Sequence, residues 1–283
     1  MSVAGSTMVE DPGTAAADAP AARTSSLLRA WDGRGIGLVA VAVFVGLWQW
    51  YGDSYPHALY LFSTPSAVAT AFGHIVASAE LPRAFADSVA EEVVGFAIAA
   101  VLGIAVGLAM GSLRFVEMSL DPLVTIGIAT PVVVLLPVME DWFGFGYVAR
   151  VAFITVLSVW PILLNSWIGV RNVSSTYHLV SRALTLGRRQ RVWKVVLPAA
   201  APYIFVGLRL GLAMATLGMV LAGQEVGDAG LGGLTEIFGQ KGLVGALIAA
   251  ILSATGLAFL LFWLLRVAEE RLFPWIRETS GSR

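Results

Sequence analysis

A few charged residues within or beside long apolar stretches of this chain are candidates for a functional role. Glu91 and Glu92 stand at the start of one such stretch, and Arg209 lies early in another. Charged side chains inside membrane-spanning segments are rare and usually mark the path of a solute or an ion. Glu91 and Arg209 are therefore candidates for a translocation pathway. The competing interpretations, which we favour, are a water-facing interfacial acid for Glu91 and an arginine that reaches back to the cytoplasmic interface for Arg209.

Two further groups of residues could shape such a pathway. Glycine and acidic residues, among them Glu225 and Gly230, follow another apolar stretch, and we expect a flexible re-entry at an outer gate there. The prolines Pro131, Pro137 and Pro161 interrupt apolar stretches, and a proline inside a helix frees a carbonyl group. Freed carbonyls are tolerated in a membrane only where protein or a cavity satisfies them. We therefore expect the three prolines to break helices near the pathway.

Catalytic and metal-binding patterns are missing from the sequence. No G-x-x-x-x-G-K-[S/T] phosphate-binding loop and no H-E-x-x-H zinc motif occurs, and cysteine is absent. The histidines His57, His74 and His178 are spread over segments that we place on opposite sides of a membrane. We therefore expect no catalytic residue, no metal site and no cofactor in this chain.

The composition indicates a membrane protein. Of the 283 residues, 57% are hydrophobic and only 13% are charged, and the mean hydropathy is +0.79. A soluble domain carries about 25% charged residues, so this chain lacks the charge to cover a water-exposed surface. The formal net charge of −1 gives no basic field for nucleic acid.

We predict an all-α polytopic membrane protein with six transmembrane helices, because six apolar stretches approach the roughly 20 residues that cross a bilayer. The stretches are residues 35–51, 89–111, 120–139, 148–170, 202–223 and 243–267. Residues 1–34 are expected to form a disordered cytoplasmic tail, since they offer too little apolar surface to fold. Residues 35–270 would form the transmembrane domain, and residues 271–283 a cytoplasmic C-terminal tail.

Arginine and lysine are distributed unevenly between the two sides of these spans. With the N-terminus inside, fourteen of the eighteen basic residues fall on the cytoplasmic side and three outside, while Arg209 lies within a span. The positive-inside rule therefore places both termini in the cytoplasm. Six of the fourteen lie in the loop 171–201, between the fourth and fifth predicted spans.

Two segments outside the spans are expected to form short helices. Residues 65–79 carry apolar side chains at helical spacing after a Ser63-Thr64-Pro65 start, which predicts a helix on the outer face. The loop 171–201 carries a second apolar stripe with a helical period. This stripe consists of Val180, Ala183, Leu184 and Gly187. By composition, the second helix fits either an interfacial helix on anionic lipid or a helix docked in a partner's groove.

The loop 171–201 resembles the EAA loop found in the membrane subunits of bacterial ABC importers. The resemblance rests on Ser181-Arg182-Ala183-Leu184-Thr185-Leu186-Gly187, followed by Leu197-Pro198. Further stretches are similar to the nitrate, sulfonate and taurine branch of this family. They are Leu135-Leu136-Pro137 through Trp142-Phe143-Gly144-Phe145-Gly146, Trp160-Pro161-Ile162-Leu163-Leu164-Asn165, Pro198 to Ile204 with Gly207-Leu208-Arg209, and Gly230-Leu231-Gly232 after Glu225.

The resemblance implies a permease subunit of a type I ABC importer in the bacterial inner membrane. Two such subunits, expected to be a homodimer in the lipid bilayer, would form the pathway. A cytoplasmic ABC ATPase dimer, which binds ATP and Mg, would dock on the coupling helices, and an extracytoplasmic substrate-binding protein would deliver the solute. The implied ATPase-coupling residues are Ser181, Arg182, Ala183, Gly187, Leu197 and Pro198. Ser181 and Arg182 replace the acid and the first alanine of the family pattern, so the docking contact is expected to be altered.

Two other classes of protein stay open at this point. A secondary transporter or channel that acts without ATP predicts membrane carboxylates for ion coupling or an inverted repeat. A membrane scaffold predicts a bundle without proline-interrupted helices. We favour the importer, which would carry a small polar or anionic solute such as nitrate, a sulfonate, taurine, bicarbonate or an aromatic carboxylate. The acid at Glu91 argues against a simple anion pathway.

Overall fold

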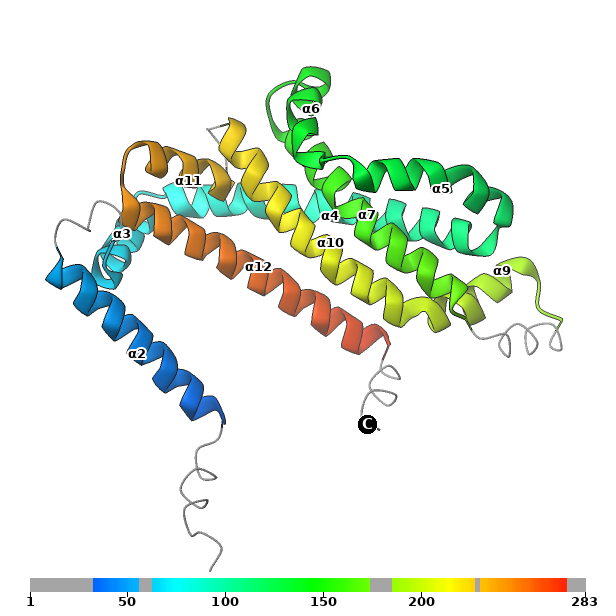
Figure 1. Cartoon of the computed structure of the whole chain (residues 1–283), viewed down its shortest axis with the longest axis horizontal. Helices are drawn as coiled ribbons and strands as arrows, with labels where there is room; N and C mark the ends of the chain where they lie inside the picture. Colours follow the sequence, from blue (N-terminus) through cyan, green and yellow to red (C-terminus); the bar gives the residue numbers. More distant parts are fainter. Residues whose placement is uncertain (1–32, 56–62, 174–184, 227–229, 274–283) are drawn as a thin grey trace, which may run out of the picture. The chain divides into compact units, whose positions relative to one another are not determined.

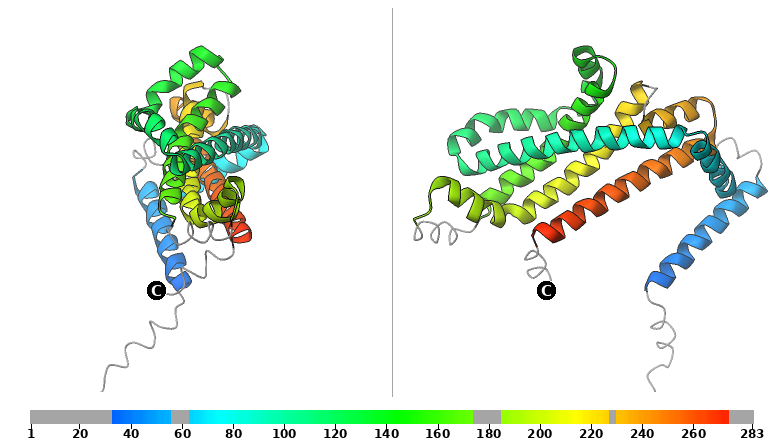
Figure 2. Two further views of the ribbon diagram at one scale, coloured as in Figure 1. Left: turned by 90° about the vertical axis from the view of Figure 1, so that its right-hand side faces the viewer. Right: turned by 180° about the vertical axis from the view of Figure 1, so that it is seen from behind.

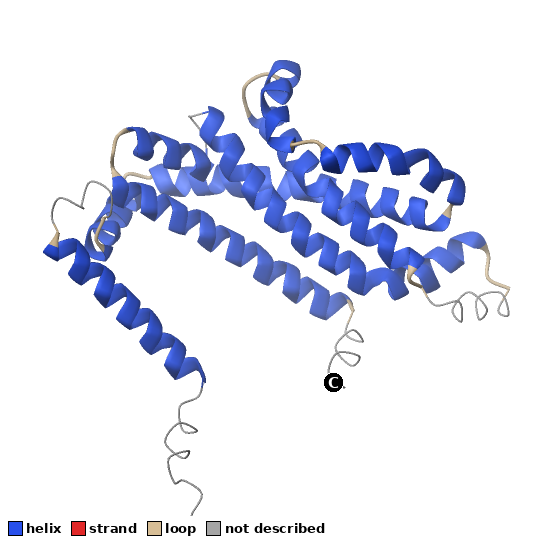
Figure 3. Cartoon of the chain, in the orientation of Figure 1, coloured by secondary structure: helices blue, strands red, loops and turns tan. Residues whose placement is uncertain are grey.

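The computed structural model describes residues 33–55, 63–173, 185–226 and 230–273, and every regular element in these ranges is helical (Figure 3). This confirms the all-α class for the described part of the chain. The elements are α2 (Gly33–Ser54), α3 (Pro65–Ala77), α4 (Glu80–Ser112), α5 (Arg114–Ala129), the 3-10 turn η3 (Val132–Leu135), α6 (Leu136–Phe143), α7 (Tyr147–Arg171), α9 (Arg188–Arg191), the π-helical turn η4 (Val192–Val196), α10 (Leu197–Val226), α11 (Gly230–Gln240) and α12 (Val244–Leu272) (Figure 1).

Four of the described helices are long and apolar enough to cross a bilayer. They are Glu80–Ser112, Tyr147–Arg171, Arg189–Glu225 and Val244–Leu272. A fifth candidate is the pair Arg114–Ala129 and Val132–Phe143, which is bent by 92°. The helix α2 covers the predicted span 35–51 but is not among these candidates. The described residues thus establish a polytopic bundle with four or five candidate spans.

The boundaries of three predicted spans need correction. The stretch 120–139 is not one helix, because Thr130 has an extended backbone (φ −72°, ψ 127°) before Pro131, as the residue preceding a proline prefers. The second span begins at Glu80 and not at residue 89, since a helix can continue through polar residues beyond the hydrocarbon. The fifth begins at Leu197 and not at residue 202.

Of the three prolines, only Pro131 lies at a helix break. Pro137 lies in the first turn of α6, where the missing N–H has no helical partner to lose. Pro161 lies inside α7, which continues as a single helix to Arg171. The expectation that Pro137 and Pro161 break helices was therefore wrong.

The centre of the bundle is α7, which packs along α4 on one side and along α10 on the other (Figures 1 and 2). On α4 a small residue recurs at every fourth position. These residues are Gly95, Ala99, Gly103, Gly107 and Gly111. A Cβ atom on Gly103 would lie 2.9 Å from Cβ of Ile162, and one on Gly107 would lie 2.6 Å from the carbonyl oxygen of Leu163. The small residues therefore let the two helices approach to backbone contact.

The segment after α10 is helical where the structure describes it. The helix α10 runs through Glu225 to Val226, residues 227–229 lie outside the described ranges, and α11 begins at Gly230. Gly232 of α11 packs directly on Gly223 of α10, and α11 also contacts α4 and α12. The described residues of this segment are therefore helical and not a flexible loop, and glycine here serves close packing. The re-entry and the outer gate stay predictions.

The predicted helix at 65–79 is confirmed as α3, which ends at Ala77. The Thr64 hydroxyl oxygen accepts a hydrogen bond from the backbone N–H of Ala67, and Pro65 occupies the first turn. Both are typical of a helix start. Val68 and Ile75 are buried on the face of α3 toward α12 and α4.

Candidate functional site

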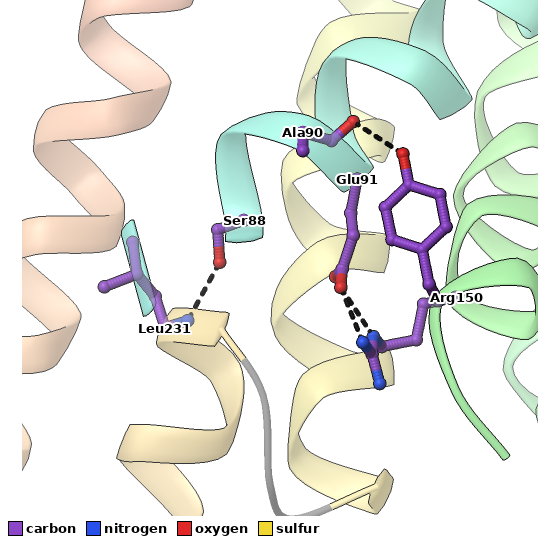
Figure 4. A network of polar contacts seen from close by, with 6 residues as sticks. Ser88, Ala90, Glu91, Arg150 and Leu231 are labelled. Carbon is purple, nitrogen blue, oxygen red and sulfur yellow. Dashed lines mark hydrogen bonds and ion pairs between the residues drawn. The ribbon is translucent and has the colours of Figure 1, made fainter. Parts of the chain in front are cut away.

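The N-terminal half of α4 and the first turns of α7 and α11 carry a network of polar contacts (Figure 4). Its centre is an ion pair between Glu91 of α4 and Arg150 of α7. Two guanidinium nitrogens of Arg150 contact Glu91 Oε1, with Nε at 2.8 Å and Nη2 at 2.7 Å. Glu91 is 1% exposed and Arg150 6%. The pair therefore holds two helices together away from water.

The interpretation of Glu91 as a water-facing acid was wrong. An isolated carboxylate is costly to bury, but a hydrogen-bonded counter-ion offsets that cost. From the sequence, Arg150 was expected only as a charge that flanks a span on the outer side, and its pairing with Glu91 was not predicted. One signal was present, since the predicted topology placed Glu91 and Arg150, with opposite charges, on the same side of the membrane.

Glu92, the neighbour of Glu91, links α4 to α10. It is 0% exposed, and its Oε1 accepts a hydrogen bond from the hydroxyl of Thr216. Its Oε2 is buried without a hydrogen-bond partner, and within the described ranges no basic residue pairs with it. The α4 helix thus contributes two adjacent buried carboxyl groups, of which the structure pairs one with a cation.

The start of α11 is attached to the same region of α4. The backbone N–H of Leu231 donates to the Ser88 hydroxyl at 2.8 Å (Figure 4). Gly230 has a φ of 72°, a left-handed conformation that favours glycine, and its Cα faces the Ser88 hydroxyl closely enough to exclude a side chain. On α7, the Tyr147 hydroxyl donates to the carbonyl of Ala90 at 3.5 Å. Four helices therefore converge on the Glu91 region.

Arg209 lies in a different region and pairs with Glu269 near the end of α12. The Arg209 side chain is 47% exposed, and that of Glu269 is 11% exposed. Arg209 is therefore not a free interfacial arginine but the partner of an acid on a neighbouring helix. The pair connects α10 with α12 while the guanidinium keeps access to its surroundings.

The coupling residues that the structure describes lie around the start of α10. The carbonyl of Gly187 accepts a hydrogen bond from the backbone N–H of Arg191, which joins it to α9. Leu197 and Pro198 form the first turn of α10, directly after the π-helical turn η4. Leu197 packs on a buried cluster from both α7 and α10. The cluster consists of Val170, Val173, Val196, Ala200 and Ile204. Ser181, Arg182 and Ala183 lie outside the described residues.

The pathway candidates do not gather into a single site. Glu91 and Gly230 lie in the polar network at the start of α4 and α11, whereas Arg209 contacts α12. Pro131 lies at the bend between α5 and α6, and Glu225 is exposed near the end of α10. Among the described residues, no group of three or more His, Asp or Glu side chains is placed to hold a metal ion.

An all-helical bundle with several candidate spans and a buried ion pair between two of them defines a polytopic α-helical membrane protein. The chain belongs to the family described as the binding-protein-dependent transport system inner membrane component, whose model matches residues 99–274. This membership confirms the resemblance to ABC importer permeases. The chain is accordingly a permease subunit and not the ATP-hydrolysing enzyme of such a system.

Relatives and a solved structure agree with this assignment. The putative aliphatic sulfonates transport permease protein SsuC of Bacillus subtilis is 29% identical over 245 residues, which cover 87% of this chain and 89% of that protein. The nitrate import permease protein NrtB of Synechocystis is 32% identical over 181 residues, 64% of this chain and 66% of that one. A chain of the MetNI methionine ABC transporter, in an inward-facing conformation, is similar in fold, with a TM-score of 0.54, 21% identity, and coverage of 66% and 92%.

Proposed function

We propose that this chain forms the pathway of an ATP-driven importer for a small anionic solute, together with a second copy of itself. The similarity to permeases named for aliphatic sulfonates and for nitrate supports this solute class, since both solutes are small and negatively charged. A cytoplasmic ABC ATPase dimer would supply ATP and Mg, and an extracytoplasmic binding protein would deliver the solute. The family description supports the dependence on a binding protein.

The attachment of the coupling segment to the bundle is the observation that carries this proposal. Leu197 packs on a cluster that combines Val170 of α7 and Val173, which follows α7, with Ile204 of α10. A displacement of the segment 171–201 by an ATPase therefore reaches α7 and α10 together. From α10, the Arg209–Glu269 pair leads on to α12. The coupling segment acts in this proposal as a lever on three helices.

The membrane topology completes the proposal. With α2 as the first span and the bent α5–α6 pair as the third, the chain crosses the membrane six times and has both termini in the cytoplasm. Arg114 at the start of α5 and Arg171 at the end of α7 then lie on the cytoplasmic side, as the positive-inside rule favours. Glu225 and Gly230 lie on the outer side, where the binding protein docks.

The two ion pairs suggest where an anion passes. Arg150 is buried and already neutralised by Glu91, so it offers no vacant guanidinium to a solute. The Arg209 side chain is 47% exposed, whereas that of Glu269 is 11% exposed, so the guanidinium is the accessible partner of this pair. An anion that competes with Glu269 for Arg209 would at the same time loosen the link between α10 and α12. Arg209 is therefore the residue of this chain best placed to contact the solute.

Reconstitution tests the proposal. Proteoliposomes containing the chain, its ATPase and its binding protein are expected to take up nitrate, taurine, an alkanesulfonate or bicarbonate only when ATP is present inside. Uptake by the chain alone, without nucleotide, would contradict the proposal and favour a secondary transporter.

The coupling contact is tested separately with Arg182→Ala and Arg182→Glu, with Arg266→Ala as the control at a distant basic residue. Both Arg182 variants are expected to lower ATPase stimulation by the binding protein, and the charge reversal more strongly. Unchanged stimulation in both would exclude this loop as the site where the ATPase docks.

The topology is tested with a single reactive thiol, which Ser282→Cys introduces because the chain contains no cysteine. Labelling of this thiol from the cytoplasmic side alone is expected for the proposed topology.

A further inference from the structure

A polar cleft of about 630 Å³ lies where α4 ends, α5 begins and α7 ends. Its charged and aromatic lining comes from two helices. The residues are Arg114, Glu117, Met118 and Asp121 of α5, and Trp167 and Arg171 of α7. The four α5 residues stand at positions i, i+3, i+4 and i+7, and the two α7 residues at i and i+4, so each set occupies one face of its helix. The cleft is therefore formed by two regular helix faces and not by a loop.

The cleft presents charges of both signs. Arg171 donates through Nη1 to Glu117 Oε1 at 3.0 Å, and its guanidinium lies 5.7 Å from the centre of the Trp167 ring. This contact occupies one of the five N–H donors of an arginine. In the part of the chain that the structure describes, Arg114 and Asp121 form no ion pair. Donors of two arginines and one free carboxylate are thus available to a ligand that carries both an anion and a cation.

An apolar surface continues from the cleft along α5. Phe115 is 82% exposed, Met118 68% and Ile126 63%. On a helix with 100° between residues, Phe115 and Ile126 share one face, and Met118 lies between that face and the polar one. The cleft also stands at the ends of the candidate spans α4 and α7, which the proposed topology places at the cytoplasmic boundary of the hydrocarbon layer. A ligand at this place has a polar group beside an apolar chain.

We propose that this cleft binds the headgroup of a zwitterionic phospholipid of the phosphatidylethanolamine type. The phosphate contacts Arg114 and Arg171, because arginine forms strong charge-assisted hydrogen bonds with phosphate oxygens. The ammonium group contacts Asp121, and an acyl chain lies along Met118 and Phe115. An anionic lipid without an ammonium group leaves Asp121 facing its phosphate, so the carboxylate selects for the zwitterion.

Lipid retention by the assembled transporter tests this site. The complex of the chain with its ATPase, in mild detergent, is equilibrated with mixed micelles of phosphatidylethanolamine and phosphatidylglycerol in equal amounts, and the bound lipid is quantified by mass spectrometry. The wild type is expected to retain phosphatidylethanolamine in excess. Arg114→Ala combined with Arg171→Ala is expected to lower this retention at least about tenfold, because the loss of one charge-assisted contact already weakens binding by about that factor.

The exposed residue Asp121 gives a variant that is expected to fold normally. Asp121→Asn is expected to abolish the preference for phosphatidylethanolamine while total phospholipid stays constant. Arg266→Ala, which removes another exposed, ion-paired arginine, is the control and is expected to retain the wild-type ratio.

Four results would overturn the proposal. The first is equal retention of both lipids by the wild type, and the second is an unchanged ratio in Asp121→Asn. The third is loss of the ATPase subunit from the double arginine variant with unchanged lipid, which would make the cleft a protein contact. Glycerophosphoethanolamine, which has the headgroup without acyl chains, is expected to displace little of the bound lipid. Full displacement at equal concentration would also overturn the lipid assignment.

Discussion

The bundle contains two interhelical ion pairs with opposite environments. Between α4 and α7, Glu91 and Arg150 are almost completely buried, whereas between α10 and α12 the guanidinium of Arg209 is 47% exposed. A buried pair is hard to separate, because either partner left alone is an uncompensated charge in a medium of low dielectric constant. An accessible pair can exchange its partner for water or an ion at little cost. The Glu91–Arg150 pair is therefore a fixed contact between helices, whereas the Arg209–Glu269 pair is one that can separate.

This difference changes how charge is used to identify function in a membrane protein. A buried arginine is the obvious candidate for binding an anion, and Arg150 fits that description by burial alone. Its carboxylate partner satisfies it within the chain, so its evident role is to join helices. The accessible Arg209, although its environment is more ordinary, keeps the capacity to interact with a solute.

The largest expected effect comes from removing one partner of the buried pair. Glu91→Ala leaves Arg150 without a counter-ion and is expected to destabilise the protein by about 3–5 kcal/mol, measured as a lowered unfolding temperature in detergent. The double variant Glu91→Met with Arg150→Met removes both charges and is expected to lose much less. If Glu91→Ala lowers the unfolding temperature no more than Arg209→Ala does, burial does not distinguish the two ion pairs.

A neutral contact in the same region is expected to have the next largest effect. Ser88→Ala removes the acceptor for the buried N–H of Leu231 and is expected to cost about 1–3 kcal/mol, the usual penalty for an unsatisfied buried group. The control is Ser119→Ala, because the Ser119 hydroxyl is exposed and bonds only within its own helix. Equal unfolding temperatures for the two variants would show that burial near Glu91 does not set the cost.

The accessible pair is expected to contribute little to stability. Arg209→Ala should cost less than Glu91→Ala, because the Arg209 guanidinium is 47% exposed, and the difference from wild type should shrink at about 1 M salt, where exposed charges are screened. The measurement is the unfolding temperature of both proteins at low and high salt. A large loss that salt does not change would place Arg209 with the buried pair and would weaken its proposed contact with the solute.

The smallest expected effect is at the ion pair within α12. Arg266 donates to Glu270 one turn further along, with side chains 71% and 32% exposed. A double-mutant cycle of Arg266→Ala and Glu270→Ala is expected to give a coupling of about 0.3–0.5 kcal/mol, as for other pairs of this spacing on a helix. If this coupling energy exceeds the coupling energy between Arg209 and Glu269, the more exposed pair would be the stronger one, which would contradict the expected ranking.

Apolar composition predicted the helices well wherever a span is limited by a clear change of polarity. The predicted span 148–170 became Tyr147–Arg171, and Thr64 and Pro65 correctly marked the start of α3. Composition could not show that α4 extends back to Glu80, because a helix that leaves the hydrocarbon continues with polar residues. It also merged α5 with α6, because apolar residues continue through a break that the backbone makes at Thr130.

The polar contacts of the site were harder to predict from the sequence, because their partners lie far apart in the chain. Glu91 and Arg150 are separated by 59 positions, and Glu92 and Thr216 by 124. Each residue alone fits a water-facing interfacial position, and only the packing of α7 against α4 removes the water. Pairing across helices depends on their rotation about their axes, which hydropathy does not specify.

The glycine positions of α4 also limit how this protein can evolve. Every single-nucleotide change in a glycine codon that alters the amino acid adds a Cβ atom, and alanine is the mildest of these replacements. At Gly103 and Gly107 that one atom would fall within 3 Å of α7, partly against its backbone. Only glycine in place of Ile162 would remove the Cβ atom that Gly103 faces, and no side-chain change removes the carbonyl of Leu163. A substitution of Gly103 is therefore tolerated only after a compensating change on α7, and no side-chain change on α7 makes a substitution of Gly107 tolerable.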